Sequence, residues 1–160
     1  MPRVFKALIV SLIFTGPIFA ADFVTSEKYG FEMEAPTINS LNTETVQYLA
    51  MCLPAKDGFA PNVNLQIQPF AGSLQEYNDL SVRQFKDAHL KVLENQTLGS
   101  EIDMEYAGDF RGNSLHWYAR AIKQDQKIFL LTATALEKSW AADSGPLLES
   151  IRSFKLTKSN

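Results

Sequence analysis

Few side chains in this chain could do chemistry, and the most suggestive pair is His116 with Asp109. A histidine beside a carboxylate can act as a general base, and Tyr118 and Arg120 follow His116 at alternate positions. The sequence places no nucleophile within reach of His116. We therefore interpret the pair as a cross-strand contact between polar side chains. A hydrolase that uses His116 as its base is the least favoured function.

Metal and thiol chemistry find little support in the pattern. The two histidines lack the H-x-x-x-H spacing that would favour a zinc site. Glu101, Asp103 and Glu105 alternate along one segment, whereas calcium prefers carboxylates that converge from a loop. Cys52 is the single cysteine and lies in an apolar run, so we expect a buried, inert thiol rather than a reactive one. We predict no catalytic residue, no metal and no cofactor.

The pair belongs to a predicted three-stranded β-meander over residues 100–135. Its first turn reads Arg-Gly-Asn-Ser, and Gly112-Asn113 is a dipeptide that suits a two-residue hairpin loop. With that loop, Asp109 lies opposite His116. One face of the two strands is then apolar, and the other pairs opposite charges. Since a slip of one residue would mix the two faces, the pattern and the turn agree.

The third strand of the meander is apolar on both sides. Asp125-Gln126 serves as its turn and places Ile122 opposite Phe129. The following residues, 128–135, read IFLLTATA, which is typical of a central strand covered on both faces. We therefore expect helices on both faces of the sheet.

The remaining elements follow from periodicity and from turn residues. We predict a kinked first strand over Phe23–Ala35, a more central strand over Thr45–Leu53, a half-buried strand over Asn62–Gln68, a helix from Leu74 to about Ala88 behind a Ser73–Glu76 capping box, a short strand or loop over His89–Asn95, and two helical segments after Ala135 that Gly145-Pro146 separates. Together these elements predict an α+β fold. Its antiparallel sheet has about six strands and is flanked by helices.

The first 20 residues have the pattern of a secretory signal peptide. Arg3 and Lys6 precede the apolar run Ala7–Phe14, and a cleavage site follows Ala20 or Ala21. The run is shorter than the roughly 20 residues that span a bilayer, and no cysteine follows it to carry a lipid. We expect export to the periplasm or secretion, with no stable membrane anchor. Residues 21–160 are then one domain.

The charge balance argues against two classes of partner. Removing the two cations of the predicted signal peptide changes the formal net charge from −3 to −5. A mildly acidic domain does not favour nucleic acid or anionic lipid surfaces. We therefore expect no nucleic-acid partner.

The order of short motifs resembles a known family. The order is Tyr29-Gly30-Phe31, an apolar strand, Phe59–Leu65 leading into a strand, Ser73–Tyr77 at a helix start, the meander, a helix that carries Trp140, and a closing Ser153-Phe154. This order resembles the Mog1/PsbP-like superfamily, most closely its bacterial DcrB-type members. The resemblance covers nearly all of residues 21–160 and implies an α-β-α sandwich without enzymatic activity. The DcrB protein itself looks like a lipoprotein, and this chain lacks the lipid-bearing cysteine.

The resemblance implies a kind of function but no particular binding residues. One branch of the superfamily binds a small GTPase, the PsbP branch is an extrinsic photosystem subunit, and a related group serves as adaptors for secreted toxins. We expect a non-enzymatic periplasmic accessory protein that binds an envelope protein partner. The alternative is a carrier of a small apolar ligand, with a pocket between helix 74–88 and the sheet near Phe85, Tyr106 and Trp117.

Overall fold

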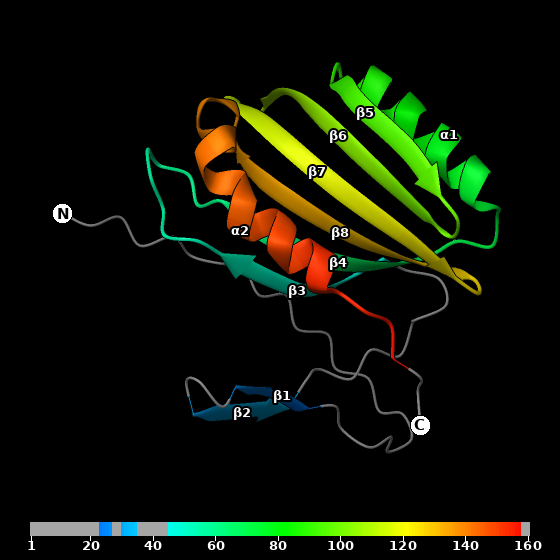
Figure 1. Cartoon of the computed structure of the whole chain (residues 1–160), viewed down its shortest axis with the longest axis horizontal. Helices are drawn as coiled ribbons and strands as arrows, with labels where there is room; N and C mark the ends of the chain where they lie inside the picture. The colour runs from blue at the N-terminus through cyan, green and yellow to red at the C-terminus, as the bar shows by residue number, and fades with distance from the viewer. Residues whose placement is uncertain (1–22, 27–29, 35–44, 158–160) are drawn as a thin grey trace. The chain divides into compact units, whose positions relative to one another are not determined.

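The computed structural model describes residues 23–26, 30–34 and 45–157, which fall into two units (Figure 1). In the first unit, β1 (Phe23–Ser26) and β2 (Phe31–Glu34) pair as an antiparallel hairpin. Gly30 has a φ of +66° where β2 begins, a conformation that glycine adopts without steric cost. The single kinked strand predicted over Phe23–Ala35 is therefore wrong, because the chain reverses within it. The predicted signal peptide lies outside the described residues, and the single-domain assignment stays a prediction.

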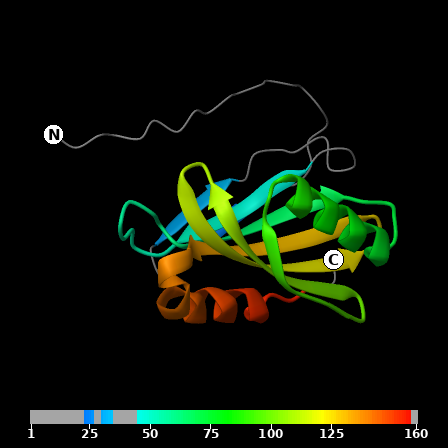
Figure 2. The ribbon, with the colours of Figure 1, turned by 90° about the horizontal axis from the view of Figure 1, so that it is seen from above.

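The second unit contains one antiparallel sheet of six strands in the order β3-β4-β8-β7-β6-β5. The strands are β3 (Val46–Cys52), β4 (Asn62–Pro69), β5 (Lys91–Leu98), β6 (Glu101–Phe110), β7 (Asn113–Gln124) and β8 (Lys127–Leu136). Helix α1 (Leu74–Asp87) covers β5 and β6 on one face. A short 3-10 helix, η1 (Glu137–Ser139), leads into α2 (Trp140–Ser153), which covers β4, β7 and β8 on the other face (Figures 1 and 2). The predicted α+β class, with helices on both faces of the sheet, is confirmed.

The β6–β7 hairpin keeps the predicted faces but not the predicted register. Its loop is Arg111-Gly112, with φ values of +51° and +82°, and Phe110 pairs with Asn113. The predicted loop was one residue later, so every cross-strand partner is displaced by two residues. Because side chains alternate with a period of two, each residue still lies on its predicted face.

Two apolar cores lie on opposite faces of the sheet, and β7 and β8 contribute alternate residues to both. The α1 core contains Tyr77, Ile102, Met104, Tyr106, Leu115, Trp117, Ala119, Ala121, Ile128 and Leu136. The α2 core contains Val63, Leu65, Ile122, Leu131, Ala133, Ala135, Leu147 and Ile151. The prediction that β8 is central and covered on both sides is confirmed, as is the pairing of Ile122 with Phe129 across the second turn.

The capping box at the start of α1 is present as predicted. Ser73 Oγ accepts a hydrogen bond from the Glu76 amide at 3.2 Å, and Glu76 Oε2 accepts one from the Ser73 amide at 2.6 Å. These bonds to Ser73 hold the pKa of Glu76 below its ordinary value. Tyr77 and Ser81 turn inward from the helix and are buried. The cap thus fixes where α1 begins, and the buried residues mark the side that faces the sheet.

Helix α2 is continuous where the sequence predicts a break. Pro146 lies inside it, in its second turn. A proline there removes one backbone hydrogen bond, to the carbonyl of Ala142, and costs about 3 kcal/mol. Leu147 and Ile151 follow Pro146 and are buried in the α2 core, and this burial offsets the loss. The predicted separation of the helix at Gly145-Pro146 is therefore wrong.

Strand β3 is an edge strand, not the more central strand that its apolar composition predicts. Tyr48, Leu49 and Met51 are 50%, 41% and 47% exposed. Cys52 is exposed too, so the expectation of a buried thiol is wrong. The ambiguous stretch after α1 is settled as β5, the opposite edge strand, which begins at Lys91. Within the described residues no helix is long and apolar enough to cross a membrane.

Candidate functional site

A pocket of about 400 Å³ opens on the α1 side of the sheet. It is lined by Phe59, Phe85, Leu90, Tyr106, Phe110, Arg111, Asn113, Leu115, Thr134 and Trp117. The floor comes from β6, β7 and β8, where Tyr106, Leu115 and Trp117 are buried. The walls come from α1 and from the loops before β4 and before β5. The structure thus brings together all three residues of the predicted ligand site, Phe85, Tyr106 and Trp117.

Three aromatic rings form a ladder along the pocket. The Phe85 ring stacks on Tyr106 with a centroid distance of 4.1 Å and an interplanar angle of 24°. Tyr106 in turn stacks on Trp117 at 5.2 Å and 16°, and Phe110 meets Trp117 edge-on at 6.4 Å. Offset stacked rings stabilise one another by about 0.5–1.5 kcal/mol per pair beyond their burial. The ladder is therefore a preformed apolar surface.

The ladder exists because of the register that the structure reveals. Tyr106 and Trp117 are direct cross-strand partners, whereas the predicted register placed Ala119 opposite Tyr106. Phe85 reaches them from the last turn of α1. Phe70 adds an edge-on contact to Tyr77 at 5.2 Å. Strand pairing and helix docking together set the positions of the three rings.

The wall beside α1 depends on a close approach at Gly108. A Cβ at that position would lie 2.7 Å from Leu90 Cδ2 and 3.4 Å from Leu90 Cα. The Leu90 amide donates a hydrogen bond to the Phe85 carbonyl at 2.8 Å, directly after His89 turns the chain with a φ of +57°. Glycine lets this segment lie against β6, which seats Leu90 in the pocket wall.

Burial raises the pKa of both tyrosines on this face above the ordinary value for a phenol. Burial is the main cause that raises the pKa of Tyr77 to about 12, and it raises the pKa of Tyr106 further. The Tyr77 hydroxyl donates a hydrogen bond to Gln68 Oε1 at 2.8 Å. The pocket floor therefore carries no ionised phenol at neutral pH.

The rim of the pocket is the β6–β7 hairpin. Phe110, Arg111 and Asn113 are exposed there. The Arg111 guanidinium lies over the Phe110 ring, 5.2 Å from its centroid, which is a cation–π contact. Sequence reasoning placed Arg111 in the first turn but missed it as a lining residue, because it looked for the pocket between helix 74–88 and the strands. The signal that could have identified it is the turn itself, since a loop tip projects its side chains beyond the sheet.

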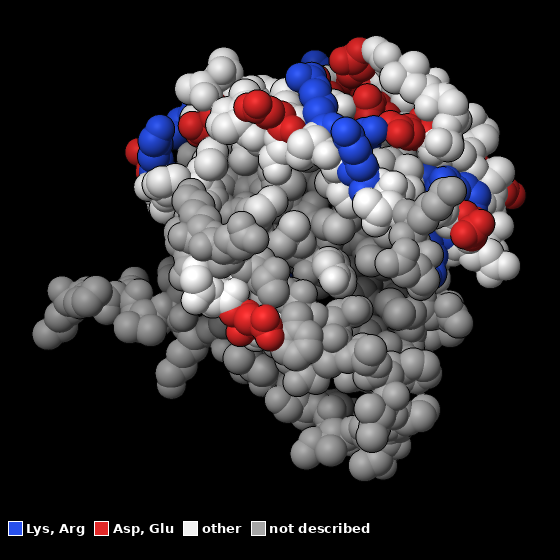
Figure 3. All heavy atoms as spheres, turned by 60° about the horizontal axis from the view of Figure 1, so that its bottom comes forward, with Lys and Arg blue, Asp and Glu red and all other residues white. Residues whose placement is uncertain are grey.

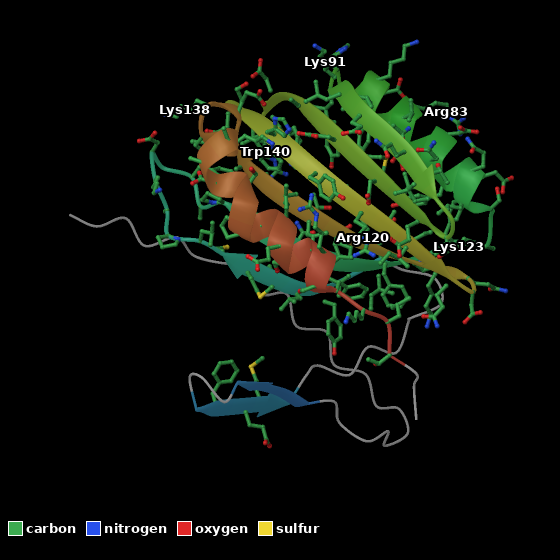
Figure 4. The ribbon with its side chains drawn as sticks, viewed as in Figure 1. Arg83, Lys91, Arg120, Lys123, Lys138 and Trp140 are labelled. Atoms are coloured by element: carbon green, nitrogen blue, oxygen red, sulfur yellow. The ribbon has the colours of Figure 1, made fainter. Side chains whose placement is uncertain are left out.

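His116 lies on the opposite face and has different partners from those predicted. Its Nε2 is 2.7 Å from Glu105 Oε1, and its Nδ1 is 2.8 Å from Glu137 Oε2. Its ring stacks on Trp140 at 4.1 Å and 13° (Figure 4). Asp109 is exposed at the end of β6, opposite Ser114. The predicted Asp109–His116 pair is therefore wrong, because the two-residue change of register moves Asp109 out of reach.

The His116 cluster is suited to holding elements together. Both ring nitrogens contact carboxylates, and the residue is 5% exposed. A neutral imidazole donates only one proton, so both contacts are hydrogen bonds only if one of the three groups carries an extra proton. The cluster joins β6, β7, η1 and the start of α2.

A smaller hollow of about 170 Å³ lies beside this cluster. It is lined by Glu94, Gln96, Asp103, Glu105, Tyr118 and Arg152. Two of the three alternating carboxylates of β6 have partners, since Glu101 pairs with Arg120 at 2.7 Å and Glu105 with His116. On the face drawn in Figure 3, the described charged side chains of both signs are interspersed. Within the described residues, no group of three or more His, Cys, Asp or Glu side chains is arranged so that it could hold a metal ion.

Comparisons with known proteins bear on the fold alone. No family model matches the chain, and no curated protein matches it. A crystal structure of a Pseudomonas aeruginosa protein of unknown function is similar, with 12% identity and a TM-score of 0.55 over 87% of this chain and 99% of that one. The solution structure of the cyanobacterial PsbP protein from Synechocystis aligns with 13% identity and a TM-score of 0.47, over 87% of this chain and 94% of that one. The chain therefore shares its α+β architecture with a protein of unknown function.

Proposed function

We propose that the protein is a non-enzymatic binding protein that holds a small apolar ligand in the pocket lined by Phe85, Tyr106 and Trp117. The observation that carries this proposal is the pocket itself, with about 400 Å³ of space and an almost wholly apolar wall. Small-molecule sites typically have volumes of roughly 300–1,000 Å³ and apolar, aromatic linings. The floor lies on the sheet and one wall on the capped helix α1, so these parts of the pocket have a fixed shape.

The driving force of such binding is the removal of apolar surface from water. Each 100 Å² of apolar ligand surface that the wall covers contributes about 2.5 kcal/mol. Part of this gain is lost to the immobilisation of the ligand. Because the aromatic ladder is already packed, little further ordering of the protein is needed. We therefore expect the affinity to follow the apolar area of the ligand rather than its hydrogen-bonding groups.

Titration with a neutral apolar fluorophore, N-phenyl-1-naphthylamine, tests this proposal. We expect saturable enhancement of its fluorescence by the full chain. Phe59→Ala removes one wall of the pocket and should weaken binding about tenfold. Phe154→Ala is the matched control, because Phe154 packs on the α2 core instead. If both variants and the parent protein bind equally, or if none of them binds, the pocket is not a ligand site.

A second candidate function is the binding of an envelope protein, and the exposed edge strand β3 favours it. An unpaired strand edge with exposed apolar side chains can accept a strand from a partner. Crosslinked capture of the tagged mature protein from envelope extract, read by mass spectrometry, tests this candidate. A stoichiometric partner that Met51→Lys releases and Phe59→Ala retains would support it. Capture that is indifferent to Met51→Lys would argue against β3 as the contact.

Export and family membership belong to the same proposal. The basic residues, apolar run and cleavage site of residues 1–21 support export to the periplasm. The order of short motifs supports membership of the Mog1/PsbP-like superfamily and its DcrB-type branch. Fractionation of the expressing bacterium, followed by N-terminal sequencing, tests the first part. A mature protein in the periplasm that begins at Ala21 or Asp22 is expected, and an uncleaved cytoplasmic protein would refute it.

A further inference from the structure

The pocket wall is apolar, but its rim carries one cation. Arg111 is the single charged side chain among the described residues that line the pocket. It is exposed at the tip of the β6–β7 hairpin, beside the amide side chain of Asn113. All the larger side chains below it are aromatic or aliphatic. A ligand that fills the pocket therefore passes from an apolar interior to a positively charged mouth.

Among the described residues, no carboxylate forms an ion pair with the guanidinium of Arg111. Its contact is with the face of the Phe110 ring, 5.2 Å from the centroid. Phe110 itself contacts Trp117 edge-on. The cation thus lies over the aromatic wall, and no described residue accepts a hydrogen bond from its N–H groups.

We propose that the ligand of this pocket is a monocarboxylate with a compact apolar body, whose carboxylate binds Arg111 at the mouth. This inference rests on the proposed ligand-binding function and adds the chemical class of the ligand. A planar guanidinium matches a carboxylate with two parallel hydrogen bonds. One cation on an exposed rim balances one negative charge, and the rim offers no second cation for a doubly charged phosphate. Asn113 adds a neutral donor beside Arg111.

Isothermal titration of the full chain with matched acids and amides tests the inference. The probes are 4-phenylbutanoate and octanoate, each compared with its own primary amide, so that the apolar body is constant while the charge is removed. We expect each acid to bind about tenfold more tightly than its amide at about 0.01 M salt. The difference should shrink at about 0.15 M salt, where the Debye length falls from about 30 Å to about 8 Å.

Two arginine variants test whether Arg111 is the residue that binds the carboxylate of the ligand. Arg111→Gln should remove the difference between acid and amide while the amides bind as before. Arg83→Gln is the matched control, because Arg83 is an exposed arginine of α1 outside the pocket wall (Figure 4), and it should retain the difference. The relative affinities of the two acids then show whether the body is aromatic or acyl.

The outcomes separate this inference from the function on which it rests. Equal binding of acid and amide to the parent protein overturns the inference and leaves the apolar pocket proposal in place. A preference for acids that survives Arg111→Gln overturns it as well. If no acid, amide or neutral fluorophore binds, both the inference and the proposed function fail.

Discussion

Replacing His116 with alanine should destabilise the domain by about 2.5–5 kcal/mol. The hydrogen bond to Glu105, whose side chain is 27% exposed, lies in the range of roughly 1.5–3 kcal/mol for bonds to charged groups. The bond to Glu137, which is 48% exposed, is discounted to about 0.5–1 kcal/mol because solvent screens it. Loss of the stack on Trp140 adds about 0.5–1 kcal/mol.

Urea denaturation of the full chain at pH 7, followed by far-ultraviolet circular dichroism, measures this loss. The two carboxylates supply an internal comparison, since Glu105→Gln should cost more than Glu137→Gln. In a double-mutant cycle, His116→Ala should remove most of the cost of Glu105→Gln. A His116→Ala variant within about 1 kcal/mol of the parent, or a reversed order of the two glutamate variants, would refute the view that His116 clamps the sheet to α2.

Three further predictions concern the two cores, the helix cap and the pocket wall. Ile102→Ala and Ile151→Ala, one fully buried in each core, should each cost roughly 2–5 kcal/mol. Their costs should add within about 0.5 kcal/mol because the sheet separates the two sites, and denaturation of the double variant checks this. The pKa of Glu76 is lowered in the folded state, so its contribution to stability is complete above the ordinary value of 4.5 and is lost as the pH falls through the lowered value. Glu76→Gln should therefore reduce the loss of unfolding free energy between pH 4.5 and lower pH, and an unchanged pH dependence would contradict this. Gly108→Ala should displace the Leu90 side chain, cost about 1–3 kcal/mol and weaken ligand binding, whereas tighter binding would show that Leu90 moves freely.

The fold class could be predicted because the alternation of apolar and polar residues, and the turn residues that end each element, are local signals in the sequence. The capping box, the alternating strand β4 and the apolar third strand of the meander each carry their own signal. The register of β6 and β7 could not be fixed in this way. Both Arg111-Gly112 and Gly112-Asn113 form acceptable two-residue loops, and both leave every side chain on the same face. Packing between the two strands decides between them.

The candidate site was likewise predictable only where local sequence signals were sufficient. Phe85, Tyr106 and Trp117 could be placed together because face and element suffice to bring them to one side of the sheet. The partners of His116 could not, because Glu137 comes from the segment that docks after β8. The prediction of a central position for β3 was wrong because its apolar composition indicates burial, whereas in the structure the strand pairs with β4 alone.

The order of the strands also has a consequence for how the chain finds its fold. Strands β5 to β8 pair with sequence neighbours through short loops, whereas β4 pairs with β8 across 58 to 72 residues. Closing a loop of about 60 residues costs roughly 2–3 kcal/mol more entropy than closing a hairpin of a few residues. The meander therefore forms early, because its closure costs less conformational entropy. The β3–β4 hairpin then pairs with the free edge of β8.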